Sequence, residues 1–323
     1  MIKKYIALCI LTCVQIFYYG CQRNHAEVHY TTIELNSACN FYSMHKDSTG
    51  AIYVCGGNQD RGVIYKSTDY GHIWKVYSDS YSKQIYDFAI LQDGNLIASS
   101  GDLELLYSTT KGKGWKQVIP SDRPKTGHQS EMYKISRAPD GAFYFCGGEK
   151  LYDGVIYYTT DTLRTLGFAH RNHEIRSMHW LGNHAIAVGY GAILYSETMN
   201  NDWQFANAPD DFYTGSTSHK NIFYSCSFNG GIYQSYDFGK NWNCINGKNR
   251  LTGKRFFYNC MALQNQHGVA LGNDGSVATT SNYGTSWNEA YSFDNADINC
   301  VINVYDNLWI AAGDDGKIFR FSF

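Results

Sequence analysis

Short segments in which hydrophobic and polar residues alternate run along the whole chain, and one arrangement of them recurs seven times. In each unit a run of small and apolar residues ends in a turn, and a second strand-like segment follows with an apolar pair, which is aliphatic–aromatic in the first five units. These pairs are Ile64-Tyr65, Leu106-Tyr107, Ile156-Tyr157, Leu194-Tyr195, Ile232-Tyr233, Val277-Ala278 and Ile318-Phe319. Strand-sized segments repeated about every forty residues are typical of propeller blades. The pattern predicts an all-β fold, a seven-bladed β-propeller with four-stranded antiparallel blades.

The two ends of the chain predict how the ring closes. The seventh unit stops at Phe323, one strand short of four, while residues 27–35 form a strand-like segment ahead of the first unit. Pairing this N-terminal strand with the last blade would supply the missing strand and bury two exposed sheet edges. We therefore expect residues 27–323 to form the propeller, with the N-terminal strand closing the last blade.

A turn with the pattern Ser-x-Asp-x-Gly-x-x-Trp follows several of the apolar pairs. The complete copies are Ser67, Asp69, Gly71, Trp74 and Ser235, Asp237, Gly239, Trp242, and the partial copies are Ser108, Gly112, Trp115, then Ser196, Trp203, then Thr280, Asn282, Gly284, Trp287. A worn copy at 159–161 has no Trp. The Asp can accept hydrogen bonds from backbone N–H groups in a tight turn, and the Gly can take a positive φ. These roles are structural, so the pattern predicts a fold and no ligand.

This turn resembles the Asp-box, or bacterial neuraminidase repeat, which occurs in sialidases, sortilin-type receptors and propellers like the photosystem II assembly factor Ycf48. The resemblance covers essentially all of residues 27–323. It implies that each box joins the third and fourth strands of a blade, on the face away from the ligand site.

The first twenty residues predict export. Lys3 and Lys4 precede an uncharged, largely apolar run, as in a secretory signal. The run ends in Gly20-Cys21, which resembles the bacterial lipoprotein signal, although an aliphatic residue is usual where Tyr18 stands. We expect a lipoprotein signal peptide over 1–20, lipid attachment at Cys21 and a short lipidated tether over 21–26. The alternative is an ordinary signal peptide with an incidental cysteine.

Composition excludes two classes of protein. The 27 basic and 29 acidic residues give a formal net charge of −2, so the chain lacks the basic surplus that neutralises phosphates, and we expect no nucleic-acid partner. Disorder is excluded because 44% of the residues are hydrophobic and only 17% are charged.

Enzymatic activity can be tested against the family pattern. Sialidases hold a carboxylate with three Arg, the first usually in an Arg-Ile-Pro motif ahead of the first box. Here no Arg lies between Arg23 and Arg61, and the nearest string, Arg137-Ala138-Pro139, falls in the third unit. We expect no catalytic residues. Because other glycosidases need only two carboxylates about 5–9.5 Å apart, a glycoside hydrolase or carbohydrate-binding propeller is the alternative. Candidate loop carboxylates are Asp102, Glu104, Glu149, Asp153, Asp210 and Asp211.

Neither histidines nor cysteines predict a metal or cofactor. His170, His173, His179 and His184 are close in sequence, but Arg171 and Arg176 lie among them and would oppose a dication. Seven cysteines follow Cys21, an odd number without C-x-x-C spacing: Cys39, Cys55, Cys146, Cys226, Cys244, Cys260 and Cys300. We interpret them as small residues where blades converge, with one disulfide or a redox-sensitive cluster as the alternative.

Long loops on one rim supply the candidate binding residues. They are Arg171, His173, Arg176, Tyr213, Arg250, Lys254 and Arg255. Arg and aromatic side chains are frequent anchors of protein interfaces. The sequence therefore indicates a non-catalytic cell-envelope lipoprotein, periplasmic or surface-exposed, that binds a protein partner or glycan.

Overall fold

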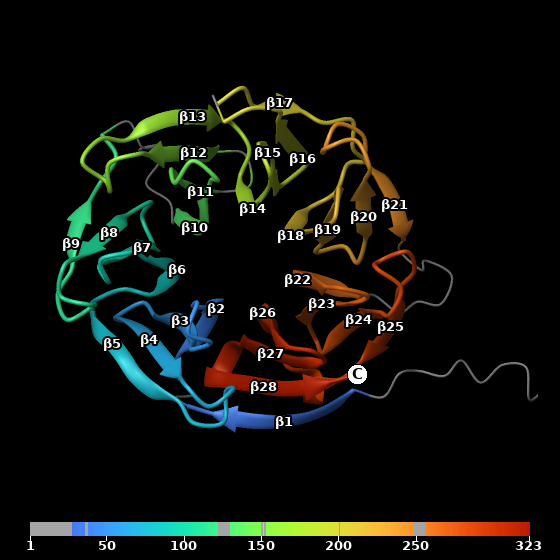
Figure 1. Cartoon of the computed structure of the whole chain (residues 1–323), viewed down its shortest axis with the longest axis horizontal. Coiled ribbons are helices and arrows are strands. Elements are labelled where there is room, and N and C mark those ends of the chain that lie inside the picture. Colours follow the sequence, from blue (N-terminus) through green and yellow to red (C-terminus); the bar gives the residue numbers. More distant parts are fainter. Residues whose placement is uncertain are drawn as a thin grey trace, which may run out of the picture.

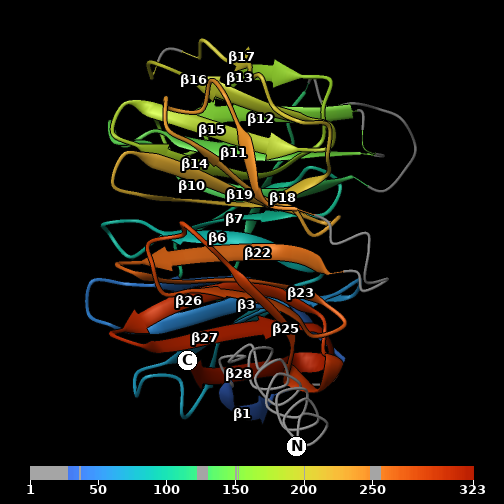
Figure 2. The same ribbon diagram turned by 90° about the vertical axis from the view of Figure 1, so that its right-hand side faces the viewer.

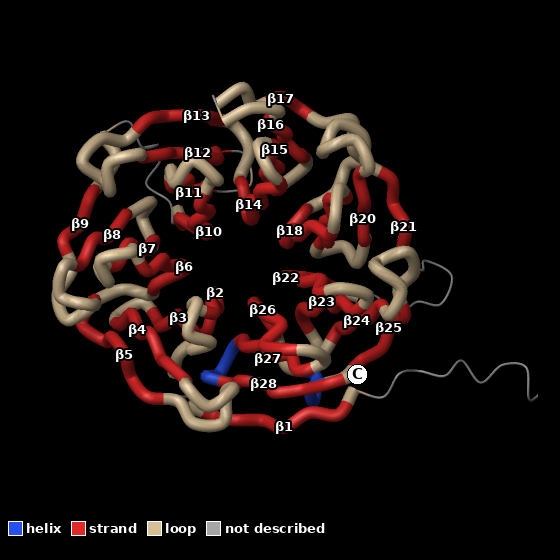
Figure 3. The backbone as a smooth tube through the Cα atoms, viewed as in Figure 1, coloured by secondary structure: helices blue, strands red, loops and turns tan. Residues whose placement is uncertain are grey.

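The protein is a ring of seven four-stranded antiparallel sheets, which confirms the predicted seven-bladed β-propeller (Figure 1). The computed structural model describes residues 28–35, 38–121, 130–149, 151, 153–199, 201–247 and 256–323. Each blade runs outward from a first, inner strand to a fourth, outer one. Two short 3-10 helices belong to the last blade: η1 (Phe293–Asn295) precedes its inner strand, and η2 (Asp314–Gly316) joins its second and third strands (Figure 3).

Each layer of strands contains one member from every blade. The inner strands are β2 (Asn40–Lys46), β6 (Ile85–Ile90), β10 (Glu131–Arg137), β14 (Ile175–Leu181), β18 (Tyr213–His219), β22 (Phe257–Gln264) and β26 (Ile298–Tyr305). The second strands are β3 (Ile52–Asn58), β7 (Leu96–Ser100), β11 (Phe143–Glu149), β15 (His184–Gly189), β19 (Ile222–Ser227), β23 (His267–Asn273) and β27 (Leu308–Gly313).

The third strands are β4 (Arg61–Ser67), β8 (Leu105–Ser108), β12 (Asp153–Thr159), β16 (Ala192–Ser196), β20 (Ile232–Ser235), β24 (Ser276–Thr280) and β28 (Lys317–Ser322). The outer strands are β5 (Lys75–Tyr81), β9 (Lys116–Val118), β13 (Gly167–Arg171), β17 (Gln204–Phe205), β21 (Asn243–Asn246), β25 (Asn288–Tyr291) and β1 (His29–Glu34).

Burial explains the small and apolar runs of the sequence. The second strands are almost entirely buried, as in β3 and β11, because neighbouring blades cover both of their faces. Cys55, Cys146 and Cys226 lie at matching places in these strands and are fully buried. No disulfide joins the seven cysteines of the described chain.

The N-terminal strand closes the ring as expected. β1 pairs antiparallel with β28 from His29 opposite Ser322 to Glu34 opposite Lys317, and the two strands lie side by side in both views (Figures 1 and 2). Tyr30 packs its ring 5.1 Å from Phe293 and 5.9 Å from Phe319, which attaches β1 to the core of the last blade. No helix of the described residues is long and apolar enough to cross a membrane.

The repeated turns join third and outer strands. In the first copy, Ser67 donates to Asp69 at 2.7 Å, and the backbone N–H of Ile73 donates to the same carboxylate at 2.9 Å. The Trp74 indole N–H donates to the Gly71 carbonyl at 3.0 Å. Equivalent bonds from Trp242 to Gly239 and from Trp287 to Gly284 measure 2.8 and 3.1 Å.

The partial copies keep the turn by other means. Ser196 donates to Asp202, which stands directly before Trp203. Asp202 thus supplies the carboxylate of this turn from a different position in the sequence. In the second blade, the Gly112 carbonyl accepts hydrogen bonds from Ser78 and Ser80 of the first blade at 2.6 and 2.7 Å. The Trp115 indole nitrogen consequently has no hydrogen-bond partner among the described residues.

The turn glycines also bring neighbouring blades into contact. Gly71 has φ +83°, and a Cβ built there would lie 2.2 Å from Cδ1 of Ile310 in the preceding blade. Gly239 has φ +94°, and its Cβ would lie 2.6 Å from Cγ2 of Ile186. Only glycine satisfies both the left-handed backbone and the close approach, so each of these two turns packs its blade onto the one before it.

We predict that the indole hydrogen bond makes Trp242 more important for stability than Trp115. Trp242→Ala should lower the free energy of unfolding by about 3–5 kcal/mol. Trp115→Ala should cost about 1–2 kcal/mol less, because Trp115 is less buried and its N–H bond is already missing. Urea denaturation of both variants measures the difference, and equal losses would contradict this account.

Candidate binding site at the channel mouth

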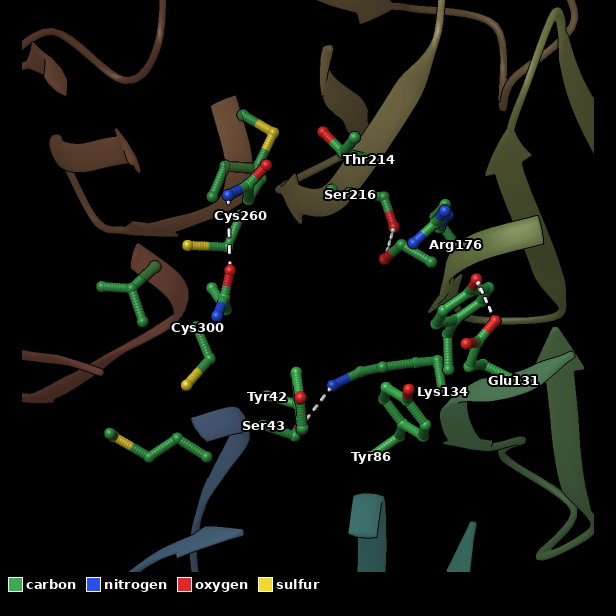
Figure 4. Close-up of a pocket in the computed structure, with 18 of the residues that line it drawn as sticks. Tyr42, Ser43, Tyr86, Glu131, Lys134, Arg176, Thr214, Ser216, Cys260 and Cys300 are labelled. Atoms are coloured by element: carbon green, nitrogen blue, oxygen red, sulfur yellow. Dashed lines mark hydrogen bonds between the residues drawn. The ribbon is translucent and has the colours of Figure 1, made fainter. Parts of the chain in front are cut away.

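All seven inner strands contain a β-bulge at the same place, where the pairing with the second strand skips one residue. The bulged residues are Tyr42, Tyr86, Tyr133, Arg176, Thr214, Asn259 and Asn299. A bulge leaves one residue outside the ladder and redirects its side chain. These seven side chains all line one cavity of about 720 Å³ among the inner strands (Figure 4). We call this ring of residues the bulge ring, and the end of the channel that they line the channel mouth.

One half of the bulge ring is aromatic and cationic. The rings of Tyr42 and Tyr86 lie 4.7 Å apart, and those of Tyr86 and Tyr133 lie 5.7 Å apart. The guanidinium of Arg176 lies 4.0 Å from the centre of the Tyr133 ring and 5.2 Å from that of Phe212. Stacking of this kind fixes a guanidinium in place. The tyrosines of three successive blades and the arginine of the fourth therefore form a continuous wall, which we call the tyrosine wall.

The other half is small and polar, and it connects neighbouring blades. Thr214 donates to the carbonyl of Tyr258 at 2.6 Å, and the Asn259 amide donates to the carbonyl of Ile298 at 3.1 Å. The Asn299 amide donates to the carbonyl of Phe41 at 3.1 Å. Each bond crosses to the next blade, so this side of the mouth is held rigidly around the open space.

Four acidic side chains line the mouth among the described residues, and burial raises the pKa of two of them. Glu174 is 2% exposed, forms an ion pair with Arg176 and accepts the Leu151 N–H at 2.6 Å. Burial raises the pKa of Glu131 above its usual value. Burial also raises the pKa of Asp314, and the negative charge of Asp297 adds to this effect. The mouth therefore combines tyrosine rings with carboxylates that are poorly solvated.

A buried ion pair lies beneath the mouth and joins the first three blades. The Asp87 carboxylate is completely buried and contacts His45 Nε2 at 2.5 Å and Lys134 Nζ at 3.2 Å. It also accepts the Ile135 N–H at 2.9 Å. Burial alone would raise the pKa of Asp87, but Lys134 and His45 outweigh it and hold the pKa well below the usual range. The pKa of Lys134 is raised, because the attraction of Asp87 outweighs burial.

This cluster does not have the geometry of a hydrolase triad. Ser43 lies 3.4 Å from the same His45 nitrogen that contacts Asp87. In a Ser-His-Asp triad the hydroxyl and the carboxylate bind opposite ring nitrogens. Lys134 also donates to Ser43 at 3.0 Å, so the hydroxyl takes part in the electrostatic network.

The structure separates the rim residues that the sequence suggested. Arg176 lies in the channel mouth, whereas His173 lies between β13 and β14 and lines a separate cavity of about 490 Å³ with Asp210 and Asp211. Arg171 ends β13, and the structure does not describe its side chain. Arg250, Lys254 and Arg255 lie outside the described residues, as do Cys21 and the segments 1–20 and 21–26.

The structure contradicts the prediction that Tyr213 is a binding residue of the rim. Its side chain is 0% exposed, and its hydroxyl donates to the Pro209 carbonyl. Tyr213 begins β18, and the bulge places the next residue, Thr214, in the channel instead. A ring with no exposed surface cannot anchor a ligand.

Several of the candidate carboxylates and histidines form contacts away from the channel mouth. Lys83 binds Asp102 and Glu104, each at 2.7 Å. Burial would raise the pKa of Asp211, but hydrogen bonds from Tyr233, Asn229 and Ser227 lower it. His179 donates to or accepts from Ser218 at 2.9 Å, and His184 stacks on Phe238 at 4.0 Å. No group of three or more His, Cys, Asp or Glu within the described ranges could hold a metal ion.

Comparisons with known proteins identify the fold. No protein-family model and no curated protein matches the sequence. Among solved structures, the chain is similar to YCF48 from Cyanidioschyzon merolae, with a TM-score of 0.66 and 12% identity over 91% of this chain and 98% of that one. A structure of YCF48 bound to D1 peptide gives the same TM-score and identity, over 91% of this chain and 97% of that chain.

A catalytically inactive virginiamycin B lyase from Staphylococcus aureus, solved with quinupristin, gives a TM-score of 0.67 and 14% identity over 91% of this chain and 100% of that one. Similarity at such low identity shows the fold alone. The chain is thus a β-propeller whose fold is shared by a peptide-bound protein and by a lyase.

Sequence reasoning missed most of the bulge ring. Tyr42, Tyr86 and Tyr133 lie inside the inner strands β2, β6 and β10, whereas the sequence predicts binding residues in the rim loops. The available signal was their common place in the repeat, ahead of the small-residue second strand in each unit. An alignment of the seven units places these residues at one equivalent position. It does not predict the bulge that directs them into the channel, because the bulge depends on how the inner strand pairs with the second strand.

We predict that Asp87 controls both stability and its dependence on pH. Asp87→Asn should destabilise the protein by roughly 2–4 kcal/mol at pH 7, below the value for a fully buried pair because Lys134 is a third exposed. Since the folded-state pKa of Asp87 is lowered, its stabilisation is present above the unfolded pKa of about 4 and is lost as the pH falls further.

Urea denaturation between pH 7 and pH 2 measures this effect. The gap between the wild-type protein and Asp87→Asn should shrink below pH 4. Asp60→Asn, a change in an exposed turn, serves as the control and should stay close to the wild type throughout. A gap that stays constant across this range would show that Asp87 does not act through its charge.

Proposed function

We propose that the protein is a non-catalytic propeller that binds a segment of a protein partner at the channel mouth. The observation that carries this proposal is the bulge ring, in which seven blades each direct one side chain into the same cavity. Its wall of Tyr42, Tyr86 and Tyr133 with the stacked Arg176 has the residue types that dominate protein interfaces. The peptide bound to YCF48 supports a protein partner for a propeller of this fold.

We further propose that the propeller works at a bacterial cell envelope. Residues 1–20 would be removed as a lipoprotein signal peptide, and Cys21 would carry the lipid that attaches the tether 21–26 to a membrane. We also interpret the repeated Ser-x-Asp-x-Gly-x-x-Trp turns as Asp-boxes. Their hydrogen bonds support this, because Ser67 and Asp69 bind turn N–H groups as the pattern requires.

Cross-linking on intact cells tests the docking proposal. The tagged, full-length protein is purified after mild cross-linking, and its partners are counted by mass spectrometry. We expect a stoichiometric protein partner that is lost in Tyr133→Ala. Tyr305→Ala is the matched control, because Tyr305 is 47% exposed at the far end of β26 and away from the mouth. If no protein co-purifies in stoichiometric amount, or if both variants lose it equally, docking at the mouth is wrong.

A glycoside hydrolase is the second candidate, and the mouth gives it one specific argument. Glu131 and Asp314 both line the cavity and both have a raised pKa, as a general acid requires. This candidate predicts turnover of aryl glycosides by the purified protein. Glu131→Gln should then reduce kcat/KM by roughly 10²–10⁴-fold. The docking proposal predicts no turnover above that of the Glu131→Gln variant.

A further inference from the structure

Among the described residues that line the channel mouth, the two positively charged side chains are each paired with a buried acid. Arg176 forms an ion pair with Glu174, whose side chain is 2% exposed. Lys134 lies 3.2 Å from the fully buried carboxylate of Asp87. Arg176 also attracts the Glu131 carboxylate, but the direct partner of each cation is a buried acid.

Three other carboxylates at the mouth have neutral hydrogen-bond donors. Glu131 accepts the Tyr133 hydroxyl at 2.9 Å, and Asp314 accepts the Asn299 amide at 2.8 Å. Asp297 accepts the backbone N–H of residue 274 at 2.8 Å. Within the part of the chain that the structure describes, these three side chains form no ion pair with Lys, Arg or His at 4 Å or less. Among the described residues that line the mouth, acidic side chains therefore outnumber basic ones.

The tyrosine wall lies between these carboxylates. Burial raises the pKa of Tyr42 to about 12, and the negative charges of Asp314 and of Glu131 add to the effect from opposite sides of the ring of blades. Tyr42 comes from the first blade, Asp314 follows β27 of the last blade, and Glu131 begins β10 of the third. Aromatic faces and carboxylates together favour a cation, because both present negative potential to it.

We propose that the channel mouth binds a cationic side chain, a lysine or arginine of the partner segment, between the tyrosine wall and the carboxylates of Glu131, Asp297 and Asp314. This inference rests on the proposed docking function and names the chemistry that the mouth recognises. A cation at this place would compensate the negative charges of these three carboxylates, two of which are poorly solvated. An anionic segment would add a fourth charge to them, so the two kinds of peptide should bind very differently.

Isothermal titration calorimetry of the purified, full-length protein tests the inference. The probes are a capped tetralysine peptide and a capped tetraglutamate peptide of the same length. We expect tetralysine to bind at least tenfold more tightly than tetraglutamate. Glu131→Gln and Asp314→Asn should each weaken tetralysine binding about fivefold to tenfold, which is the size of one lost charge contact at a partly buried site.

Asp79→Asn is the matched control. Asp79 is an exposed aspartate on the outer strand β5, where it pairs with Arg61, so its replacement removes the same charge far from the mouth. Its tetralysine affinity should equal that of the wild type, and thermal melting confirms that all three variants fold. Comparable binding of the two peptides would overturn the inference, as would an equal loss of affinity in Asp79→Asn.

The outcome also separates this inference from the docking proposal. If a partner co-purifies and is lost in Tyr133→Ala, yet tetralysine neither binds nor displaces it, docking stands and recognition of a cation is wrong. If tetralysine binds with the expected dependence on Glu131 and Asp314 but no partner co-purifies, the cation site stands and the docking proposal fails.

Discussion

Closure of the ring is the constraint on which the other features depend. Seven blades can surround a channel only if the last one meets the first, and here the first strand of the chain completes the last sheet through the β1–β28 ladder. Without it, β28 would present an unpaired edge. The same pairing holds β26 beside β2, where Asn299 reaches the carbonyl of Phe41. The geometry of the channel mouth thus depends on residues at both ends of the chain.

Contacts between neighbouring blades then fix the ring at three radii. Outside, the glycines of the repeated turns press against the preceding blade, as Gly71 does against Ile310. In the middle, the buried second strands pack face to face. Inside, hydrogen bonds from the bulge ring and the ion pair of Asp87 join adjacent inner strands. Because each radius has its own set of contacts, the channel can hold buried polar groups in fixed positions.

The fold could be predicted from the sequence because its units repeat. The binding site could not, because it depends on the register between the inner and second strands of each blade. Seven similar units indicate blade number, strand order and closure, because these follow from period and length. The position of Tyr213 illustrates what sequence leaves open, since a one-residue bulge buries it and exposes Thr214 to the channel. Asp202 shows the same limit, because it replaces a missing turn aspartate from another place in the sequence.

The bulge ring also has a consequence for how such proteins diverge. A bulged residue stands outside the ladder of its strand, so its side chain can be exchanged while the sheet keeps its hydrogen bonds. Each blade offers one such position, and the seven share a single cavity. A lineage can therefore acquire a new ligand through a few substitutions, one blade at a time, while inheriting an unchanged scaffold.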